Sequence, residues 1–426
     1  MAAPLHFLLF FAVICLHPIV DASPAQSSYL SISLIVPVTK HASSLQYLTK
    51  IHHNGIGTGG LLPTDLVVDL GGPFLWMDCG SSSSGRLVSY GSIHCLAAKP
   101  TMVSHDHGSR NFLESCNLFT ENRITQMGAQ GDLVQDVLAI RSTDEDGSVA
   151  SVSHNFLFTC APKSLLSGLA NGAQGMLGLG RHRISLPSQI SSAFHSKSQF
   201  ILCLSSSNGV LSFGNRPQSS YFGPELSESL IYTPLLTTQS HHEYFINLQS
   251  IKINDKTLSL DKSLLSLNED GLRGTKLSTI VPYTVMESSI YAIFYKAYEK
   301  AAMAMNMTRV PNVSPFGLCF SSKGIRETVV GPQVPPIDLV LQSKMVKWRI
   351  YGRNSMVQVS NEVMCLGFLD GGLNLKSSIT LGGHQLEDVL LHFDLGTSML
   401  GFSPSLLLKQ RSCSDLKFDF MPKQSL

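Results

Sequence analysis

Asp69 is the first residue of this chain that could do chemistry, and it lies in the stretch DLVVDLGGPFLWMDCG at residues 65–80. An apolar run with β-branched residues precedes Asp69, and Gly71, Gly72 and Pro73 follow it, which predicts a strand, a tight turn and a second short strand. A carboxylate at the edge of such a turn can transfer protons as a general acid or base. Most Asp-X-Gly triplets, however, are ordinary turns in which the aspartate accepts a local hydrogen bond. The second half of the chain decides between these two interpretations.

That second half repeats the plan of the first. Two similar apolar runs end in glycine, GMLGLG around Gly178 and ITLGG around Gly382. Asp69 lies 109 positions before Gly178, and Ser278, in the turn of GTKLSTIVPYTV, lies 104 positions before Gly382. Similar motif pairs at similar spacing predict a duplicated fold with two lobes.

The elements between these motifs are predicted to be mainly strands. Residues 28–49 alternate apolar and polar side chains, as half-buried strands do. The segment ISLPSQISSAF predicts a short helix capped near Ser185 with Pro187 in its first turn, and residues 274–302 predict a strand, a turn and a long helix. A loop-rich boundary near residue 215 divides the chain into an N-terminal lobe, 23–215, and a C-terminal lobe, 216–426.

The N-terminus and the charge indicate a secreted protein. Residues 1–22 contain a short apolar core and end in the small residue Ala22, which predicts a signal peptide. A membrane anchor is the alternative, but His17 and Pro18 interrupt the apolar run. With 14% charged residues, a net charge of +1 and no basic run, the chain is not expected to bind nucleic acid. We therefore expect a monomeric extracellular or cell-wall (apoplast) protein with no membrane partner.

Cysteine usage agrees with an oxidising compartment. Cys15 would leave with the signal peptide, and eight cysteines would remain: Cys79, Cys95, Cys116, Cys160, Cys203, Cys319, Cys365 and Cys413. They predict four disulfides, for which the sequence leaves roughly a hundred pairings open. Asn306 and Asn312 begin N-x-Ser/Thr triplets and are the expected glycosylation sites.

Two further patterns suggest a ligand only weakly. Residues 55–60, GIGTGG, match a dinucleotide-binding motif, but no strand precedes them and no helix follows, so a flexible loop is favoured. The pairs His52-His53 and His241-His242 are not expected to bind a metal, because adjacent histidines on a strand would point to opposite faces and no further ligand lies at a suitable spacing. Surface loops are favoured for both pairs. We predict no metal and no cofactor.

Long motifs make the chain resemble a known family over residues 28–416. The runs VDLGGPFLW, GMLGLGRHRISLPSQ, GTKLSTIVPYTV and ITLGGHQLEDVLLHFDL carry the resemblance. It is to the plant pepsin-like aspartic peptidase homologues, a group that includes extracellular dermal glycoproteins, xyloglucan-specific endoglucanase inhibitors, xylanase inhibitors and basic seed globulins. The resemblance implies a mostly β, bilobal pepsin-like double β-barrel with a few short helices. It also implies the disulfides Cys319–Cys365 and Cys203–Cys413.

The same resemblance indicates a defective active site. Active relatives carry Asp-Thr-Gly or Asp-Ser-Gly in both lobes, and their second catalytic aspartate falls on Ser278 of this chain. The residue after Asp69 is Leu70, which has no hydroxyl, and residues 119–131 lack the tyrosine of the family's flap hairpin. Because two carboxylates must share one proton in this chemistry, we predict a pseudoenzyme without catalytic residues.

The resemblance further implies a protein partner, a microbial glycoside hydrolase such as a xyloglucan-specific endoglucanase or a xylanase. Candidate inhibitor loops are residues 321–330, with Lys323 and Arg326, and 409–413, with Lys409 and Arg411. Arginines there could fork onto the paired carboxylates of such an enzyme. Inhibitory relatives carry an arginine where this chain has Val329, and solvated loop charges are the alternative interpretation.

Two other functions stay open at this point. A residual aspartic endopeptidase would use Asp69 with an unrecognised partner, but neither Asp65 nor Asp78 lies in the duplicated position. A storage or peptide-binding wall protein, rather than an inhibitor with a role in plant defence, is the third interpretation.

Overall fold

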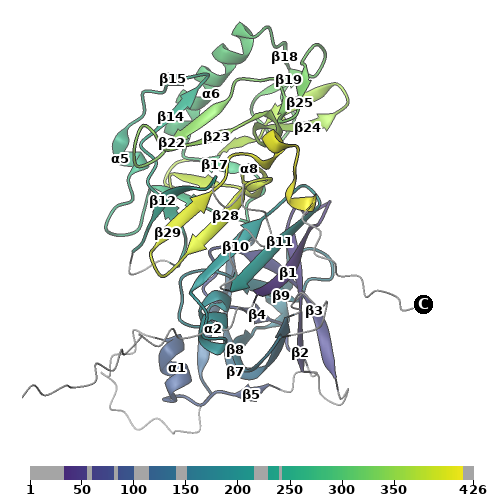
Figure 1. Cartoon of the computed structure of the whole chain (residues 1–426), viewed down its shortest axis with the longest axis vertical. Coiled ribbons are helices and arrows are strands. Elements are labelled where there is room, and N and C mark those ends of the chain that lie inside the picture. Colours follow the sequence, from purple (N-terminus) through teal and green to yellow (C-terminus); the bar gives the residue numbers. More distant parts are fainter. Residues whose placement is uncertain are drawn as a thin grey trace, which may run out of the picture.

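The computed structural model describes residues 33–54, 60–80, 85–99, 115–140, 151–214, 229–238 and 242–415, apart from the side chains of residues 33 and 151–154. The signal peptide, residues 55–59 and His241 of the predictions above lie outside these ranges. Strands dominate the described chain, and the two lobes are stacked along the long axis (Figure 1). This arrangement confirms the mostly β, bilobal pepsin-like prediction.

The first lobe is built from eleven strands and three short helices among its described residues. They are β1 (Ser33–Lys40), β2 (Tyr47–Asn54), β3 (Leu61–Asp69), β4 (Trp76–Met77), β5 (Arg86–Leu87), α1 (Ile93–Ala98), β6 (Asn117–Asn122), β7 (Met127–Ile140), β8 (Ser151–Cys160), η1 (Lys163–Leu166), β9 (Gly175–Gly178), α2 (Leu186–Ala193), β10 (Gln199–Cys203) and β11 (Asn208–Gly214).

The second lobe contains shorter strands and the one long helix of the described chain. Its elements are β12 (Ile231–Leu236), β13 (Phe245–Ile246), β14 (Ser250–Ile253), β15 (Lys256–Thr257), α5 (Lys262–Leu265), β16 (Thr275–Leu277), β17 (Thr284–Met286), α6 (Ser288–Ala304), β18 (Arg309–Val310), β19 (Cys319–Ser321), β20 (Glu327–Thr328), β21 (Gly331–Pro332), β22 (Ile337–Val340), β23 (Lys347–Ile350), α7 (Gly352–Ser355), β24 (Met356–Ser360), β25 (Val363–Leu366), β26 (Phe368–Asp370), β27 (Ile379–Leu381), α8 (Gly383–Leu386), β28 (Leu390–Asp394), β29 (Met399–Phe402), η2 (Leu406–Lys409) and η3 (Cys413–Asp415).

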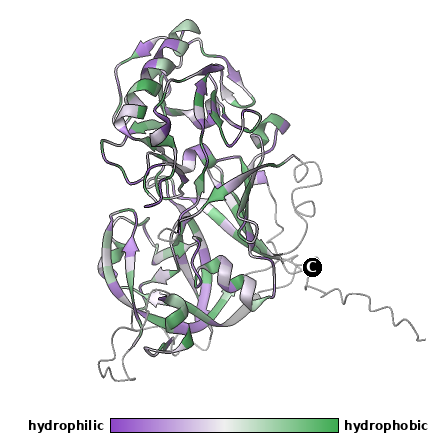
Figure 2. Ribbon diagram, turned by 90° about the vertical axis from the view of Figure 1, so that its left-hand side faces the viewer, coloured by the Kyte–Doolittle hydropathy of each residue, from purple (hydrophilic) through white to green (hydrophobic). Residues whose placement is uncertain are grey.

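A continuous antiparallel sheet joins the lobes. Its strands follow the order β1, β11, β10, β28, β29 and β12, so the teal β10 of the first lobe pairs with the yellow β28 of the second (Figure 1). Phe200 on β10 lies opposite Phe393 on β28, and their rings stack with centroids 4.6 Å apart. Hydrophobic and hydrophilic residues alternate along many strands of both lobes (Figure 2), as strands with one buried face require.

Each lobe contains the same four-strand motif, which confirms the predicted duplication. In the first lobe β3 runs parallel to β9, with Asp69 opposite Gly178, and β4 pairs with β8 and β9. In the second lobe β16 runs parallel to β27, with Leu277 opposite Leu381, and β17 pairs with β26 and β27. Ser278 follows β16 directly. Asp69 and Ser278 therefore end equivalent strands, and both turns face the space between the lobes.

The two predicted helices are present. Helix α2 begins after Ser185 and carries Pro187 in its first turn. Helix α6 begins after Glu287, whose side chain accepts a hydrogen bond from the Ser289 amide at 2.9 Å, and it buries Ile290, Phe294 and Tyr298 on one face. No helix in the described ranges is long and apolar enough to cross a membrane.

All eight cysteines outside the predicted signal peptide form disulfides. Cys203–Cys413 and Cys319–Cys365 confirm the pairings implied by the family resemblance. The other two, which sequence left open, are Cys79–Cys160 and Cys95–Cys116. Cys79 reaches Cys160 because β4 lies beside β8, with Met77 opposite Cys160.

Candidate functional site

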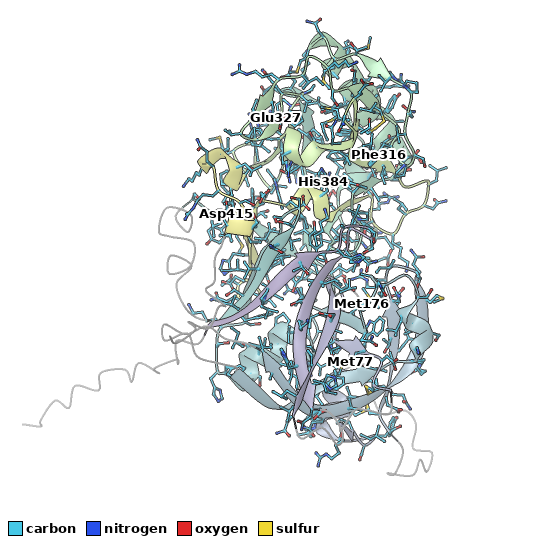
Figure 3. All side chains as sticks on the ribbon, turned by 90° about the vertical axis from the view of Figure 1, so that its right-hand side faces the viewer. Met77, Met176, Phe316, Glu327, His384 and Asp415 are labelled. Atoms are coloured by element: carbon cyan, nitrogen blue, oxygen red, sulfur yellow. A yellow bond between two sulfur atoms is a disulfide. The ribbon has the colours of Figure 1, made fainter. Side chains whose placement is uncertain are left out.

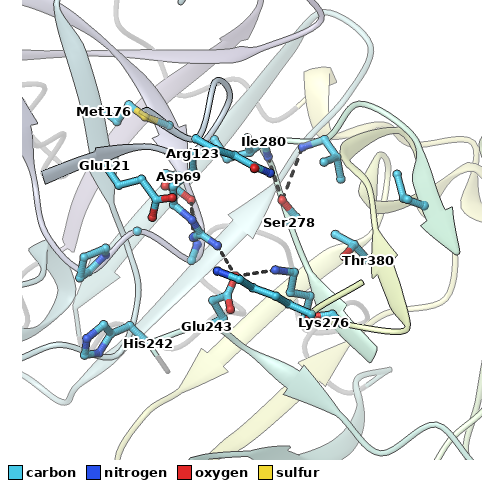
Figure 4. Close-up of a pocket in the computed structure, with 18 of the residues that line it drawn as sticks. Asp69, Glu121, Arg123, Met176, His242, Glu243, Lys276, Ser278, Ile280 and Thr380 are labelled. Atoms are coloured by element: carbon cyan, nitrogen blue, oxygen red, sulfur yellow. Dashed lines mark hydrogen bonds and ion pairs between the residues drawn. The ribbon is translucent and has the colours of Figure 1, made fainter. Parts of the chain in front are cut away.

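A cleft of about 670 Å³ lies between the two equivalent turns. Its first-lobe wall includes Trp76, Phe119 and Met176, and its second-lobe wall includes Ile280 and Val285. Charged side chains converge at its centre (Figure 4). The cleft thus combines apolar walls with a few polar groups, which is the usual composition of a ligand pocket.

The turn after β3 holds the Asp69 carboxylate by its own backbone. The Gly71 amide donates to Asp69 Oδ1 at 3.1 Å, and the Gly72 amide donates to the Asp69 carbonyl oxygen at 3.2 Å. A Cβ on Gly72 would lie 2.7 Å from Asp69 Oδ2, so only glycine fits there. The carboxylate is 2% exposed. The predicted strand and Gly turn at Asp69 are therefore confirmed.

A chain of alternating charges crosses the cleft from Asp69, and we call it the cleft cluster: Asp69, Arg123, Glu243 and Lys276. Arg123 Nη1 lies 3.2 Å from Asp69 Oδ1, and its Nη2 pairs with Glu243 Oε1 (Figure 4). Lys276 Nζ lies 2.7 Å from the same Glu243 oxygen. Asp69 and Arg123 belong to the first lobe, and Glu243 and Lys276 to the second, so the cleft cluster bridges the lobes with no net charge.

Burial and pairing act against each other in the cleft cluster. Burial raises the pKa of Asp69, although Arg123 and the Gly71 amide pull it down. Burial disfavours the charged guanidinium as well, but Asp69 and Glu243 outweigh this effect, so the pKa of Arg123 is raised. Arg123 is therefore a permanent cation beside Asp69.

The turn after β16 carries a hydroxyl where the first lobe carries the carboxylate. Ser278 Oγ accepts a hydrogen bond from the Ile280 amide at 3.1 Å, and the Ser278 amide donates to the Leu381 carbonyl at 2.9 Å. This self-contained turn uses Ser278 as a local backbone partner, in the way that Asp69 uses Gly71.

Thr279 ties the two turns together. Its Oγ1 accepts from the Leu70 amide at 3.0 Å and donates to the Val68 carbonyl at 2.6 Å. The corresponding bonds from the first lobe are absent, because Leu70, the residue equivalent to Thr279, has no hydroxyl. One half of a symmetric interlobe connection is thus present.

The segment that lacks the expected tyrosine folds as a hairpin over the cleft. Strands β6 and β7 pair from Asn117 to Asp132, and residues 123–126 form the turn between them. Phe119, Glu121, Arg123 and Gln126 from this hairpin line the cleft. An arginine, rather than a tyrosine, enters from the hairpin tip.

The four predicted loop cations lie on the second lobe and are exposed. Lys323 and Arg326 precede β20, and Lys323 Nζ lies 3.1 Å from Glu362. Lys409 ends η2, and Arg411 lies in the following turn. None of the four is among the residues that line the cleft.

Arg353 and Asp388 each anchor one of the two loops. The Arg353 amide donates to the Val330 carbonyl at 2.8 Å, which anchors the first loop. Asp388 accepts from Ser412 Oγ at 2.7 Å and from the Cys413 amide at 3.0 Å. Burial raises the pKa of Asp388, although these two hydrogen bonds pull it down. Figure 3 labels Glu327, which belongs to the first loop, and Asp415, which lies two residues after the second loop.

The surface-loop prediction for the histidine pairs is wrong at His52-His53. Both residues belong to β2, which pairs with β3 and β7, and His53 is buried with its Nδ1 2.9 Å from the Asn54 carbonyl. His242 lines the cleft, where its ring lies 4.8 Å from that of His182. The described residues contain no group of three or more His, Cys, Asp or Glu side chains suited to a metal ion.

Sequence reasoning missed three members of the cleft cluster. Arg123 lies at the tip of residues 119–131, the segment that lacks the tyrosine of the family's flap hairpin. Lys276 interrupts an apolar strand two residues before Ser278, which was a usable signal, because a charge between buried neighbours needs a partner. Glu243 follows the His241-His242 pair, and no pattern in the sequence connects it to Asp69.

Comparison with known proteins places this geometry in a family. Residues 47–215 match the family model described as "Xylanase inhibitor N-terminal", and residues 243–404 match "Xylanase inhibitor C-terminal". A "Probable aspartic proteinase GIP2" from Nicotiana benthamiana is 41% identical, with 95% of this chain and 98% of that protein covered.

Solved structures agree in sequence and in shape. The crystal structure of edgp is 45% identical and superposes with a TM-score of 0.82, covering 92% of this chain and 99% of that one. The basic 7S globulin from soybean is 33% identical, with a TM-score of 0.76 and coverage of 91% and 99%. The chain therefore belongs to the xylanase-inhibitor family of pepsin-like proteins.

Proposed function

We propose that this protein is a catalytically inactive relative of the aspartic peptidases that inhibits a microbial glycoside hydrolase, either a xyloglucan-specific endoglucanase or a xylanase. The cleft is the observation that carries the proposal. Only one of its two equivalent turns ends in a carboxylate, and Arg123 neutralises that carboxylate. Ser278 stands in the place of the second acid.

The chemistry of aspartic peptidases explains why this cleft is inactive. Two carboxylates about 3 Å apart must share one proton, so that one acts as a base toward water and the other as an acid. A serine hydroxyl cannot take either part near neutral or acidic pH. Glu243 is a second carboxylate in the cleft, but the guanidinium of Arg123 contacts both acids and holds each as a partner of a cation.

The outer face of the second lobe supports the inhibitor role. Arg326 and Arg411 are exposed on two loops of the second lobe. Glycoside hydrolases present two carboxylates in an open groove, and a guanidinium can bind a carboxylate with two parallel hydrogen bonds. The loops are anchored by backbone contacts to Arg353 and Asp388, so they would enter such a groove without a large loss of conformational entropy.

Inhibition assays with loop variants test this proposal. The purified protein is expected to bind and inhibit a fungal xyloglucan-specific endoglucanase or a fungal xylanase. Arg326→Ala or Arg411→Ala should weaken inhibition by about tenfold or more, since a desolvated charge pair is lost. Lys50→Ala, at an exposed first-lobe lysine, is the matched control and should change nothing. Retention of no hydrolase from fungal culture filtrate would reject inhibition and favour a storage or peptide-binding wall protein.

A residual peptidase is the second candidate, because Asp69 keeps its Gly turn and an open cleft beside it. Casein hydrolysis at acidic pH separates this candidate from the pseudoenzyme. Activity that pepstatin abolishes, and that Asp69→Asn also abolishes, would establish peptidase function. We expect no such activity.

We further propose that the mature chain begins after residue 22, is secreted to the apoplast and stays monomeric, with lobes at 23–215 and 216–426. The paired cysteines support an oxidising compartment. Asn306 and Asn312 are both exposed, as glycan attachment requires. Enzymatic deglycosylation of protein secreted by plant cells should lower its mass by two glycans, and removal of Asn306 and Asn312 should abolish that change.

A further inference from the structure

The tip of the β6–β7 hairpin is held in place by a buried side chain. Asn122 is fully buried, and its Oδ1 accepts from the Ile124 amide at 2.9 Å and the Thr125 amide at 3.2 Å. Its Nδ2 donates to the Leu165 carbonyl at 2.7 Å and the Ser167 carbonyl at 2.9 Å. These bonds fix the backbone on both sides of Arg123, so the direction of the arginine is set by the fold.

The guanidinium of Arg123 lies in a seat shaped for it. Asp69 contacts one of its terminal nitrogens and Glu243 the other, so each acid takes one arm of the planar fork. Gly71 completes the seat, because a Cβ at this position would collide with Arg123 Nη1. Lys276 balances the second acid from the opposite side. Carboxylates from two lobes and a closely approaching glycine thus surround one guanidinium.

We propose that Asp69, Glu243 and Gly71 form a guanidinium-binding site, which Arg123 fills from within the same chain, so that Arg123 fastens the β6–β7 hairpin to the second lobe across the interlobe cleft. A guanidinium-bearing ligand, such as an arginine side chain of a peptide, is the class of molecule that would compete with Arg123 for the site. The site lies in the cleft and is independent of the outer loops proposed to bind a hydrolase.

Removing the charge of Arg123 should loosen the β6–β7 hairpin. In Arg123→Ala two carboxylates would remain near each other with Lys276 as their only partner within the cleft cluster, and their repulsion opposes closure. Amide hydrogen exchange in peptides covering residues 119–131 should become roughly tenfold faster than in the wild type. Arg309→Ala, at an arginine paired with Glu299 on the surface, is the matched control and should leave this exchange unchanged. Exchange within about twofold of the wild type in Arg123→Ala would overturn the proposal.

Chemical rescue tests the site itself. Methylguanidinium at roughly 10 mM should raise the Tm of Arg123→Ala and slow its hairpin exchange, because a ligand that binds only the folded state stabilises it. Arg123→Ala/Glu243→Gln lacks one of the two acids and should lose the rescue. Equal responses of the single variant, the double variant and the wild type would overturn a guanidinium site.

A milder change keeps the test usable if Arg123→Ala does not fold. Arg123→Lys retains the charge but cannot contact both acids with a planar fork. Amide exchange in the hairpin of Arg123→Lys should be faster than in the wild type. Exchange equal to that of the wild type would show that charge alone closes the hairpin and would contradict a seat built for guanidinium.

Discussion

Asp69 and Glu387 are two carboxylates with similar burial, 2% and 3% exposed, and both lie where the lobes meet, yet their pKa values move in opposite directions. Burial raises the pKa of Asp69 more than its partners lower it. Burial also raises the pKa of Glu387, but His384 and Lys40 more than offset this and bring it to about 2. The two side chains are equally buried, so the difference between their pKa values comes from their charged and hydrogen-bonding partners.

Glu387 belongs to a denser set of contacts, which we call the Glu387 cluster: Lys40, Tyr47, His384 and Glu387. Lys40 Nζ lies 2.6 Å and Tyr47 Oη 2.9 Å from Glu387 Oε1, and His384 Nδ1 lies 3.6 Å from Oε2. Asp69 has one guanidinium nitrogen, on an arginine it shares with Glu243. The Glu387 cluster therefore holds the lobes together strongly. In the cleft cluster the partners of Asp69 do not fully offset its burial, so its contacts are easier to displace.

Neutralising Glu387 should have the largest effect. A folded pKa of about 2, against 4.5 in the unfolded chain, corresponds to about 3 kcal/mol of stability. Because the folded pKa is lowered, this stability is present above pH 4.5 and is lost as the pH falls toward 2. Glu387→Gln should therefore lose about 3 kcal/mol at pH 7, measured by urea unfolding. A Glu387→Gln variant with the unfolding free energy of the wild type at pH 7 would contradict a stabilising role for the Glu387 carboxylate.

Thr279 connects the two turns of the cleft by uncharged hydrogen bonds, and its removal should cause the second largest loss of stability. Thr279→Val leaves the Leu70 amide and the Val68 carbonyl without their partner in a buried place, which should cost about 2 kcal/mol. Thr279→Ser keeps the hydroxyl and is the control. Equal stability of the valine and serine variants in thermal unfolding would show that this connection is energetically unimportant.

The two lysines allow a matched test of the two clusters. Lys40→Met should cost about 2 kcal/mol, because it leaves Glu387 buried without its cation. Lys276→Met should cost about 1 kcal/mol or less, since Glu243 keeps Arg123. Unfolding free energies of the two variants, measured in the same buffer, give the ranking directly. The reverse ranking would show that the cleft cluster stabilises the fold more than the Glu387 cluster does.

Asp69→Asn should have the smallest effect and the opposite dependence on pH. A raised folded pKa means that Asp69 favours the folded state when protonated, below pH 3.8, and that this contribution is lost as the pH rises through the folded pKa. The asparagine variant should lie within about 1 kcal/mol of the wild type at pH 7 and should lack this decline. A large loss at pH 7 would mean that the charged carboxylate is well compensated after all.

Much of the fold was predictable from local patterns. The strand and glycine turn at Asp69, the start of α2 near Ser185, the long helix α6 and the repeated motifs at Gly178 and Gly382 depend on neighbouring residues, which the sequence displays. The family resemblance added the overall architecture and two of the four disulfides.

The candidate site was only half predictable. Arg123 lies 54 residues from Asp69 and 120 from Glu243, and a single sequence contains no record of which distant charges meet. The surface-loop prediction fails at His52 and His53, because strand β2 accommodates both side chains on its two alternating faces. Tertiary packing, rather than local preference, decided both cases.

The pairing of β10 with β28 has a consequence for any attempt to produce one lobe alone. A chain that stopped near residue 215 would leave the β10 edge, Gln199–Cys203, with open backbone donors and acceptors, and Cys203 without Cys413. Uncovered strand edges recruit other strands. Such a half-protein should self-associate through this edge, so each lobe depends on the other to cover its open strand.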